Sequence, residues 1–130
     1  EAEWERAARG PHGATYPWGD QAPSCQRAWF QGCASTQRTS AVGTFPAGAS
    51  PEGFHDLAGN VFEWVHDWME QGYYERSPTA NPPGPSTGEY RVLRGGGFSS
   101  EGLALAGWAR QGYTPGSRLA NLGFRCVTVP

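Results

Sequence analysis

Glycine and proline are so frequent in this chain that they argue against a bundle of long helices. The 130 residues include 19 Gly and 11 Pro, which favour turns and interrupt regular elements. Six Trp, five Tyr and six Phe supply enough apolar area for an ordered core, so the composition also argues against disorder. The length suits one domain with one core. We therefore expect short elements joined by long structured loops.

Charge and residue usage exclude several classes of function. The net charge of −2 gives no sign of an electrostatic nucleic-acid binder. All ten basic residues are Arg, which rules out Schiff-base lysine chemistry and a phosphate-binding lysine loop. No apolar run approaches about 18 residues, so membrane insertion is not expected, and the localisation stays open. Cys25 and Cys33 flank a loop that a disulfide could close, and we expect all three cysteines, with Cys126, to be structural.

The order of patterns along the chain predicts an irregular α+β domain. The first residues read as the end of an amphipathic helix that stops at Gly10-Pro11. The densest apolar stretch is DLAGNVFEWVHDW, and a proline-rich connection unsuited to regular structure follows it. The expected segments are a helix over 1–9, short strands over 41–45, 90–96 and 121–129, and the connection over 71–88.

Four blocks of the sequence resemble one known family. EAEWERAARG, YPWGD, GTFPAGASPEGFHDLAGNVFEW and RVLRGG…LGFRC stand in the order typical of the formylglycine-generating enzyme (sulfatase-modifying factor) domain. The resemblance implies the variant of the C-type lectin-like fold that this family adopts. It also implies that residues 1–130 are the C-terminal portion of a single domain, with an upstream N-terminal segment of the same protein as a partner. The family includes copper-dependent oxidases, iron-dependent sulfoxide synthases, accessory domains and variable proteins of diversity-generating retroelements.

The resemblance makes an oxidase doubtful. Formylglycine-generating enzymes bind copper through two cysteines just after the GG block, where this chain has Ser100 and Leu105. Leucine cannot bind a metal, so we expect no copper and assign no catalytic residue. The sulfoxide synthases take most iron ligands from a separate N-terminal domain, so this segment could supply only substrate contacts. The histidines His12, His55 and His66 lack metal spacing, and Asp67 beside His66 is expected in a surface or capping role.

The DLAGNVFEW block has two readings. The family resemblance implies a structural calcium site with side-chain oxygens from Asp56 and Glu63 and carbonyl oxygens from Gly59 and Val61, which are hard ligands of the kind that calcium prefers. The alternative is a tight turn stabilised by Asn60. A second family calcium site is not expected, because Trp29 stands where an Asn is needed.

Residues 94–126 form a candidate variable region. Related domains carry a pattern like RGGSWNN…LR-A-R…PDNR-NN-GFR here, and this chain keeps the scaffold positions, including Arg94, Arg110, Arg118 and Arg125, while altering residues between them. Most altered residues are those that an Asn codon gives when its adenines are replaced: Ser, Gly, Ala, Leu, Phe, Tyr or Thr. Glu101, Trp108 and Gln111 do not fit this rule. The scaffold arginines are expected to pair with carboxylates such as Glu63 or Asp67.

The chemistry of the same segment favours recognition over catalysis. Residues 97–121 contain one carboxylate, two Arg, and no His, Cys or Lys, whereas short hydroxylated and aromatic side chains suit an adaptable binding surface. We predict non-catalytic binding of a ligand, expected to be a protein. A generic accessory domain and a metal-dependent enzyme of the same family remain as alternatives. The residues predicted to contact the ligand are Phe98, Ser99, Ser100, Leu103, Leu105, Trp108, Tyr113, Ser117 and Leu119, of which Leu105 and Trp108 also suit core positions.

Overall fold

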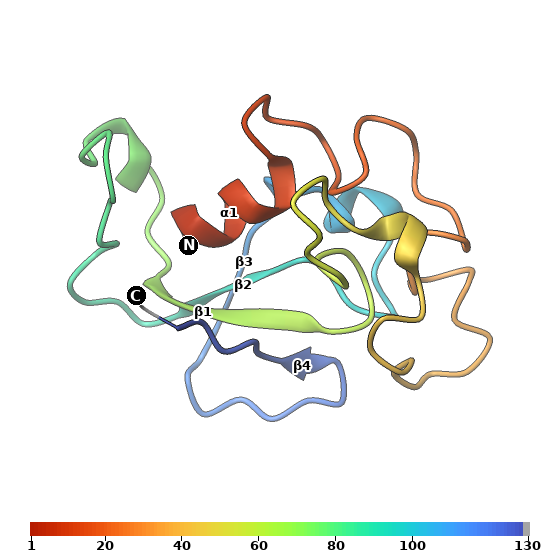
Figure 1. The fold of residues 1–130 in the computed structure, drawn as a ribbon. Coiled ribbons are helices and arrows are strands. Elements are labelled where there is room, and N and C mark those ends of the chain that lie inside the picture. Colours follow the sequence, from red (N-terminus) through yellow and green to blue (C-terminus); the bar gives the residue numbers. More distant parts are fainter. Residues whose placement is uncertain (129–130) are drawn as a thin grey trace.

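A small mixed sheet and one short helix organise a chain that is mostly loop (Figure 1). The computed structural model describes residues 1–128. The regular elements are the helix α1 (Ala2–Arg9), the strands β1 (Phe62–Trp68), β2 (Arg91–Arg94), β3 (Gln111–Tyr113) and β4 (Leu122–Gly123), and the 3₁₀ turns η1 (Pro46–Gly48), η2 (Tyr73–Glu75) and η3 (Gly102–Leu105).

The four strands form a sheet in the order β3-β2-β1-β4. Strands β1 and β2 pair antiparallel with Glu63 opposite Arg94, and β2 and β3 pair antiparallel as well. Strand β4 pairs parallel with the beginning of β1, where Leu122 lies opposite Phe62. The β1–β2 register shifts between Trp64 and Trp68, an irregularity that bends a strand and increases its twist. The C-terminal strand therefore meets the sheet at the same end as the DLAGNVFEW block.

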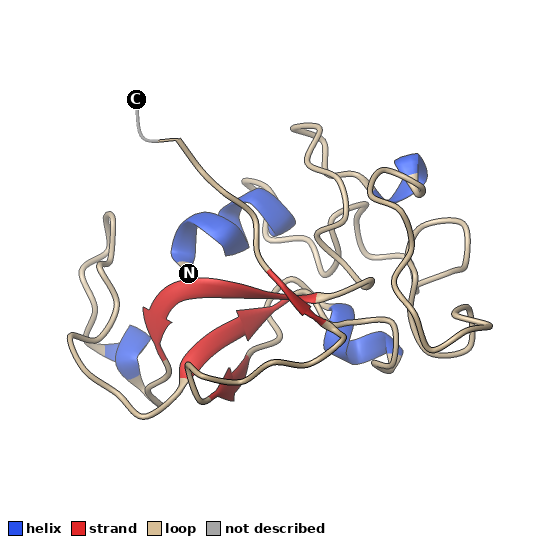
Figure 2. Ribbon diagram, turned by 90° about the horizontal axis from the view of Figure 1, so that it is seen from below, coloured by secondary structure: helices blue, strands red, loops and turns tan. Residues whose placement is uncertain are grey.

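Helix α1 lies against the sheet through one narrow apolar face (Figure 2). Trp4 and Ala8, four residues apart, are buried with Leu57, and Val65 of β1 packs against this cluster. Glutamates in the first turn and arginines in the last turn interact favourably with the helix dipole. The helix ends at Gly10, whose φ of 62° is left-handed and carries little strain in glycine.

A second core cluster joins distant loops. Tyr16, Ala28, Ala58, Leu105 and Ala106 are buried together, with Trp18, Phe30 and Ala109 packed around them. The loop that carries Ala28 is closed by a disulfide between Cys25 and Cys33. Loops from the first half of the chain thereby support the segment that follows β2.

The structure confirms part of the expected element order. The helix over 1–9 and the strand over 90–96 are present, while β4 is much shorter than expected over 121–129, and Val129 lies outside the described residues. The strand expected over 41–45 is wrong: Gly43 has φ of 75°, and Thr44 Oγ1 donates to the Ala41 carbonyl within a turn. The mixed sheet with few helices is compatible with the expected α+β, C-type lectin-like class. In residues 1–128, no helix reaches the length and apolarity that a membrane span requires.

Candidate functional site

Arg94 at the end of β2 fixes the backbone of the segment that follows it. The side chain is fully buried, and its guanidinium donates to the carbonyl oxygens of Gly107 (2.8 Å), Trp108 (3.1 Å) and Ala109 (2.9 Å). It also donates to the Glu5 carboxylate of α1 at 2.6 Å. One charged side chain thus satisfies three consecutive carbonyls, which would be costly to bury unpaired. The conformation of this loop depends on backbone contacts, and those contacts do not involve the Trp108 side chain.

Burial divides the predicted ligand contacts into two groups. Phe98 is 5% exposed and Leu105 is 0% exposed, so the prediction that they contribute to the surface is wrong. The reason is packing: Leu105 belongs to the second core cluster, and Phe98 is held inside by a hydrogen bond from its amide to the Asn60 carbonyl at 2.8 Å. The remaining seven are exposed or half-buried: Ser99, Ser100, Leu103, Trp108, Tyr113, Ser117 and Leu119.

The structure brings some of these residues together beside β4. Asn121 Nδ2 donates to Ser99 Oγ at 3.4 Å, which joins the loop after β2 to the loop before β4. Ser117 and Leu119 line a hollow of about 450 Å³ with Phe124. Phe124, which the sequence analysis did not single out as a ligand contact, is 74% exposed. It follows directly after the two-residue edge strand β4, whose short length the sequence did not indicate.

Tyr113 and Trp108 lie elsewhere. Tyr113 of β3 pairs with Arg91 of β2, and Arg91 pairs with Trp68 at the C-terminal end of β1. Strand β4 pairs instead with Phe62 at the N-terminal end of β1. Six residues along a strand correspond to roughly 20 Å. Trp108 follows Gly107, whose amide donates to the Thr15 carbonyl at 2.7 Å near the end of α1. The predicted contacts therefore do not form one continuous patch.

Ser100 and Leu105, which stand where formylglycine-generating enzymes carry the copper-binding cysteines, have structural roles in this chain. Ser100 Oγ accepts the Gly97 amide proton at 2.9 Å, and its carbonyl accepts the Gln31 amide proton at 3.0 Å. Leu105 fills the core. Within residues 1–128, no group of three or more His, Cys, Asp or Glu side chains is arranged to hold a metal ion.

The residues expected to hold calcium lie at one turn, but the carboxylate of Glu63 is already satisfied. Asp56 and Glu63 line one hollow of about 510 Å³ together with Val61. Glu63 is 6% exposed, and both of its oxygens accept hydrogen bonds from Arg125. The oxygen donors are of a type that suits calcium, yet in this arrangement they do not fit the ion because a guanidinium already binds Glu63.

Asn60, which the alternative interpretation expects to stabilise a tight turn, forms hydrogen bonds with the backbone. Its side chain accepts the Ser40 amide proton at 2.8 Å and donates to the Ser40 carbonyl at 3.2 Å. Its φ of 65° and that of Gly59, 80°, form a tight left-handed turn. A Cβ on Gly59 would lie 2.5 Å from the Trp29 carbonyl oxygen, so this backbone approach requires glycine.

Three of the four scaffold arginines form ion pairs. Arg125 pairs with Glu63, as expected, while Arg94 and Arg110 pair with Glu1, the residue before α1. Burial opposes the charge of Arg110, but its bonds to Glu1 leave its pKa raised. Arg118 is exposed.

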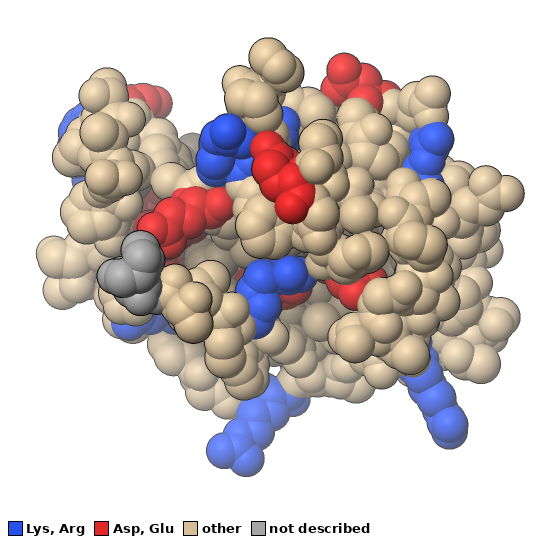
Figure 3. Space-filling view, viewed as in Figure 1, with Lys and Arg blue, Asp and Glu red and all other residues tan. Residues whose placement is uncertain are grey.

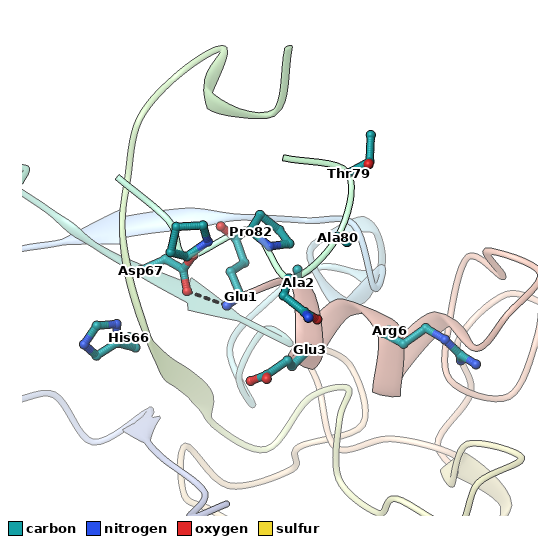
Figure 4. A pocket seen from close by; sticks show the side chains of 11 residues that line it. Glu1, Ala2, Glu3, Arg6, His66, Asp67, Thr79, Ala80 and Pro82 are labelled. Carbon is teal, nitrogen blue, oxygen red and sulfur yellow. Dashed lines mark hydrogen bonds and ion pairs between the residues drawn. The ribbon is translucent and has the colours of Figure 1, made fainter. Parts of the chain in front are cut away.

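Asp67 is buried, so the expectation of a surface position is wrong. It lies beside Glu1 at the edge of a hollow between α1 and the 79–83 loop (Figure 4). His66 is exposed, and adjacent side chains on a strand point to opposite faces. The pair therefore lacks the geometry of a catalytic dyad.

Acidic and basic side chains are interspersed on the face drawn in Figure 3, and neither sign dominates it. The net charge of −2 agrees with this mixed surface. This face therefore lacks the basic stripe by which proteins bind nucleic-acid backbones.

Comparison with known proteins places this architecture in a family. The model of the sulfatase-modifying factor enzyme 1-like domain matches residues 1–129. A formylglycine-generating enzyme of Streptomyces coelicolor is 41% identical over 98% of the chain and 45% of the relative. The serine/threonine-protein kinase pkn1 of Chlamydia pneumoniae is 40% identical over 98% of the chain and 20% of the relative.

A solved structure supports the same assignment. Treponema denticola variable protein 1 superposes with a TM-score of 0.77 at 30% identity, over 95% of this chain and 44% of the other. The chain therefore spans less than half the length of these relatives. With its matching family model and its sequence and structural relatives, the chain belongs to the sulfatase-modifying factor enzyme 1-like domain family, which confirms the resemblance to formylglycine-generating enzymes.

Proposed function

We propose that this chain is a non-catalytic binding module that recognises a protein through exposed residues of the 97–121 segment. The observation that carries the proposal is the exposure of apolar side chains on a backbone that other residues hold in place. Leu103, Trp108 and Leu119 are all substantially exposed, while Arg94 binds the carbonyls of 107–109. Rigid loops that present aromatic, aliphatic and hydroxyl side chains are typical of recognition surfaces.

The likeness to Treponema denticola variable protein 1 supports a role in which the surface is diversified. We infer that adenine-specific mutagenesis rewrites codons in the region encoding 94–126. Ser99, Ser117 and Leu119 are residues that such a change of an Asn codon can give, and all three lie outside the core. Trp108, which does not fit the codon rule, would be encoded by the template.

The burial of Phe98 and Leu105 narrows the proposed surface. The contacts are Ser99, Leu103, Trp108, Tyr113, Ser117 and Leu119, with Ser100 contributing through the part of its side chain that remains accessible. Because these residues are distributed over several sites, we expect the ligand to contact one subset of them. Ser117 and Leu119 lie together at one hollow beside β4.

The nucleotide sequence around the gene tests the proposed origin of the surface. A near-copy of the region encoding 94–126, differing almost only at adenines of the copy and lying beside a reverse-transcriptase gene, is the expected result. A locus without such a repeat would overturn the retroelement origin.

A protein-level experiment tests whether the proposed surface tolerates changes of its side chains. A variant with simultaneous changes at Ser99, Leu103, Trp108 and Leu119 is expected to keep the melting temperature of the wild type, because exposed substitutions usually alter stability by less than about 0.5 kcal/mol each. A collapse of the melting temperature would show that these side chains hold the fold together and would refute a tolerant surface.

The second candidate is an enzyme, and the relationship to the Streptomyces coelicolor formylglycine-generating enzyme favours it. Against it, Ser100 and Leu105 occupy the positions of the copper-binding thiols, and a serine hydroxyl already bonded to Gly97 is a poor copper ligand. Incubation with copper and cysteine-containing peptides in air, followed by mass spectrometry, is expected to detect no conversion of cysteine to formylglycine beyond that in a control without the protein. Turnover in this assay would favour the enzyme, whereas an accessory domain would show neither turnover nor ligand binding.

A further inference from the structure

Glu63 binds an internal cation at the turn where the family resemblance suggests calcium. Arg125 and Glu63 form a bidentate ion pair. Arg125 Nε donates to Glu63 Oε2 at 2.8 Å, and Arg125 Nη2 donates to Glu63 Oε1 at 2.5 Å. Trp4 Nε1 of α1 donates to the same Oε2 at 2.6 Å. A carboxylate has roughly four acceptor positions, and three donors already occupy most of them here.

The same guanidinium also reaches the other side of the turn. Arg125 Nη2 donates to the His55 carbonyl at 3.0 Å. The bonds to Glu63 raise the pKa of Arg125 most strongly, and the negative charge of Asp56 adds to this effect. Asp56 in turn accepts the Gly43 amide proton at 2.7 Å. One side chain thus connects the 55–56 turn to the start of β1, which is the connection that an ion between Asp56 and Glu63 would make.

We infer that Arg125 supplies the positive charge of this site and that the turn is stable without calcium. Calcium takes six to eight oxygens and would need Glu63 as one of its few charged ligands. Placing a divalent ion beside a guanidinium on the same carboxylate adds repulsion at short range. Calcium binding to Glu63 and the ion pair between Arg125 and Glu63 therefore compete. This inference does not depend on the proposed binding function.

The test compares the wild type with R125Q, which removes the charge and keeps a polar side chain. Melting temperatures are measured by calorimetry in excess EDTA and in millimolar calcium chloride, and calcium binding is titrated by calorimetry. The wild type is expected to melt at the same temperature in both buffers. R125Q is expected to melt lower in EDTA and to bind calcium at least about tenfold more tightly than the wild type, because the competing charge is gone.

Two further variants protect the test from a trivial loss of folding. R125K keeps the positive charge but lacks the planar guanidinium group. It is expected to melt below the wild type, and its melting temperature is expected to be the same with and without calcium. R118Q, at an exposed arginine of the same segment, is the matched control and should behave like the wild type. A wild type that binds calcium and melts higher in it would overturn the inference. An R125Q variant as stable as the wild type in EDTA would overturn it as well.

Discussion

The two leucines of η3 provide a direct test of which residues form the interior and which the surface. Leu105 is 0% exposed and Leu103 is 69% exposed, although both lie in the same 3₁₀ turn. Replacing Leu105 by Ala leaves a cavity among the buried Tyr16, Ala58 and Ala106, and such changes cost about 3 kcal/mol or more. L103A removes only exposed surface and should cost less than about 0.5 kcal/mol.

The unfolding entropy, which scales with chain length, relates this loss of unfolding free energy to a shift in melting temperature. At about 2.1 cal/mol/K per residue, the unfolding entropy of a 130-residue chain is roughly 0.27 kcal/mol/K, so 3 kcal/mol corresponds to about 10 °C. Differential scanning calorimetry of the wild type, L103A and L105A measures both shifts, and urea unfolding checks the free energies. An L103A variant that loses as much as L105A would refute the division between interior and surface.

Three further predictions test the scaffold that supports the proposed surface. R94M should lower the unfolding free energy by about 3–5 kcal/mol, because it leaves buried acceptors without their cation, and hydrogen exchange should increase across 107–109. The double variant C25S/C33S should lower it by about 2–3 kcal/mol in urea unfolding, since the disulfide closes a short loop. G59A should lower the melting temperature by several degrees, because a left-handed backbone and a carbonyl contact both exclude a side chain there.

Matched controls exist for two of these variants. C126S changes an exposed free cysteine and should leave the urea midpoint unchanged, so a loss equal to that of C25S/C33S would indicate that serine itself is harmful. G116A changes a glycine with open space around the position of its Cβ. If G116A and G59A shift the melting temperature equally, the steric explanation for Gly59 is wrong.

The sequence predicted the elements with strong local signals and failed where tertiary contacts decide. The helix over 1–9 ends at a glycine, and β2 is a run of Val and Leu between arginines. Strand β3, a finding of the structure, has only three residues with Gly112 in the middle, so its pairing with β2 determines it rather than its propensity. Val42 suggested a strand, but the left-handed Gly43 beside it turns the chain.

Burial within the candidate surface was the least predictable property. Leu103 and Leu105 are two residues apart on a 3₁₀ turn of about three residues per turn, so they cannot share a face. The sequence shows two similar leucines, and only the placement of η3 beside the second core cluster distinguishes them. The ion pair of Arg125 with Glu63 was among the expected pairings, because both residues lie in blocks that carry the family resemblance. The saturation of Glu63 by Arg125 and Trp4 together required the fold.

The contacts of the 97–121 segment explain how its surface could vary while its backbone persists. Most of the bonds that fix this segment involve backbone groups: the carbonyls of 107–109 bind Arg94, and the Phe98 amide binds the Asn60 carbonyl. Such bonds do not depend on which side chain the segment carries. Ser100 is one exception, because its hydroxyl accepts the Gly97 amide proton. A residue without an acceptor at position 100 would leave that amide without this partner, so variation there is limited by the fold, whereas Leu103 and Leu119 are limited mainly by the ligand.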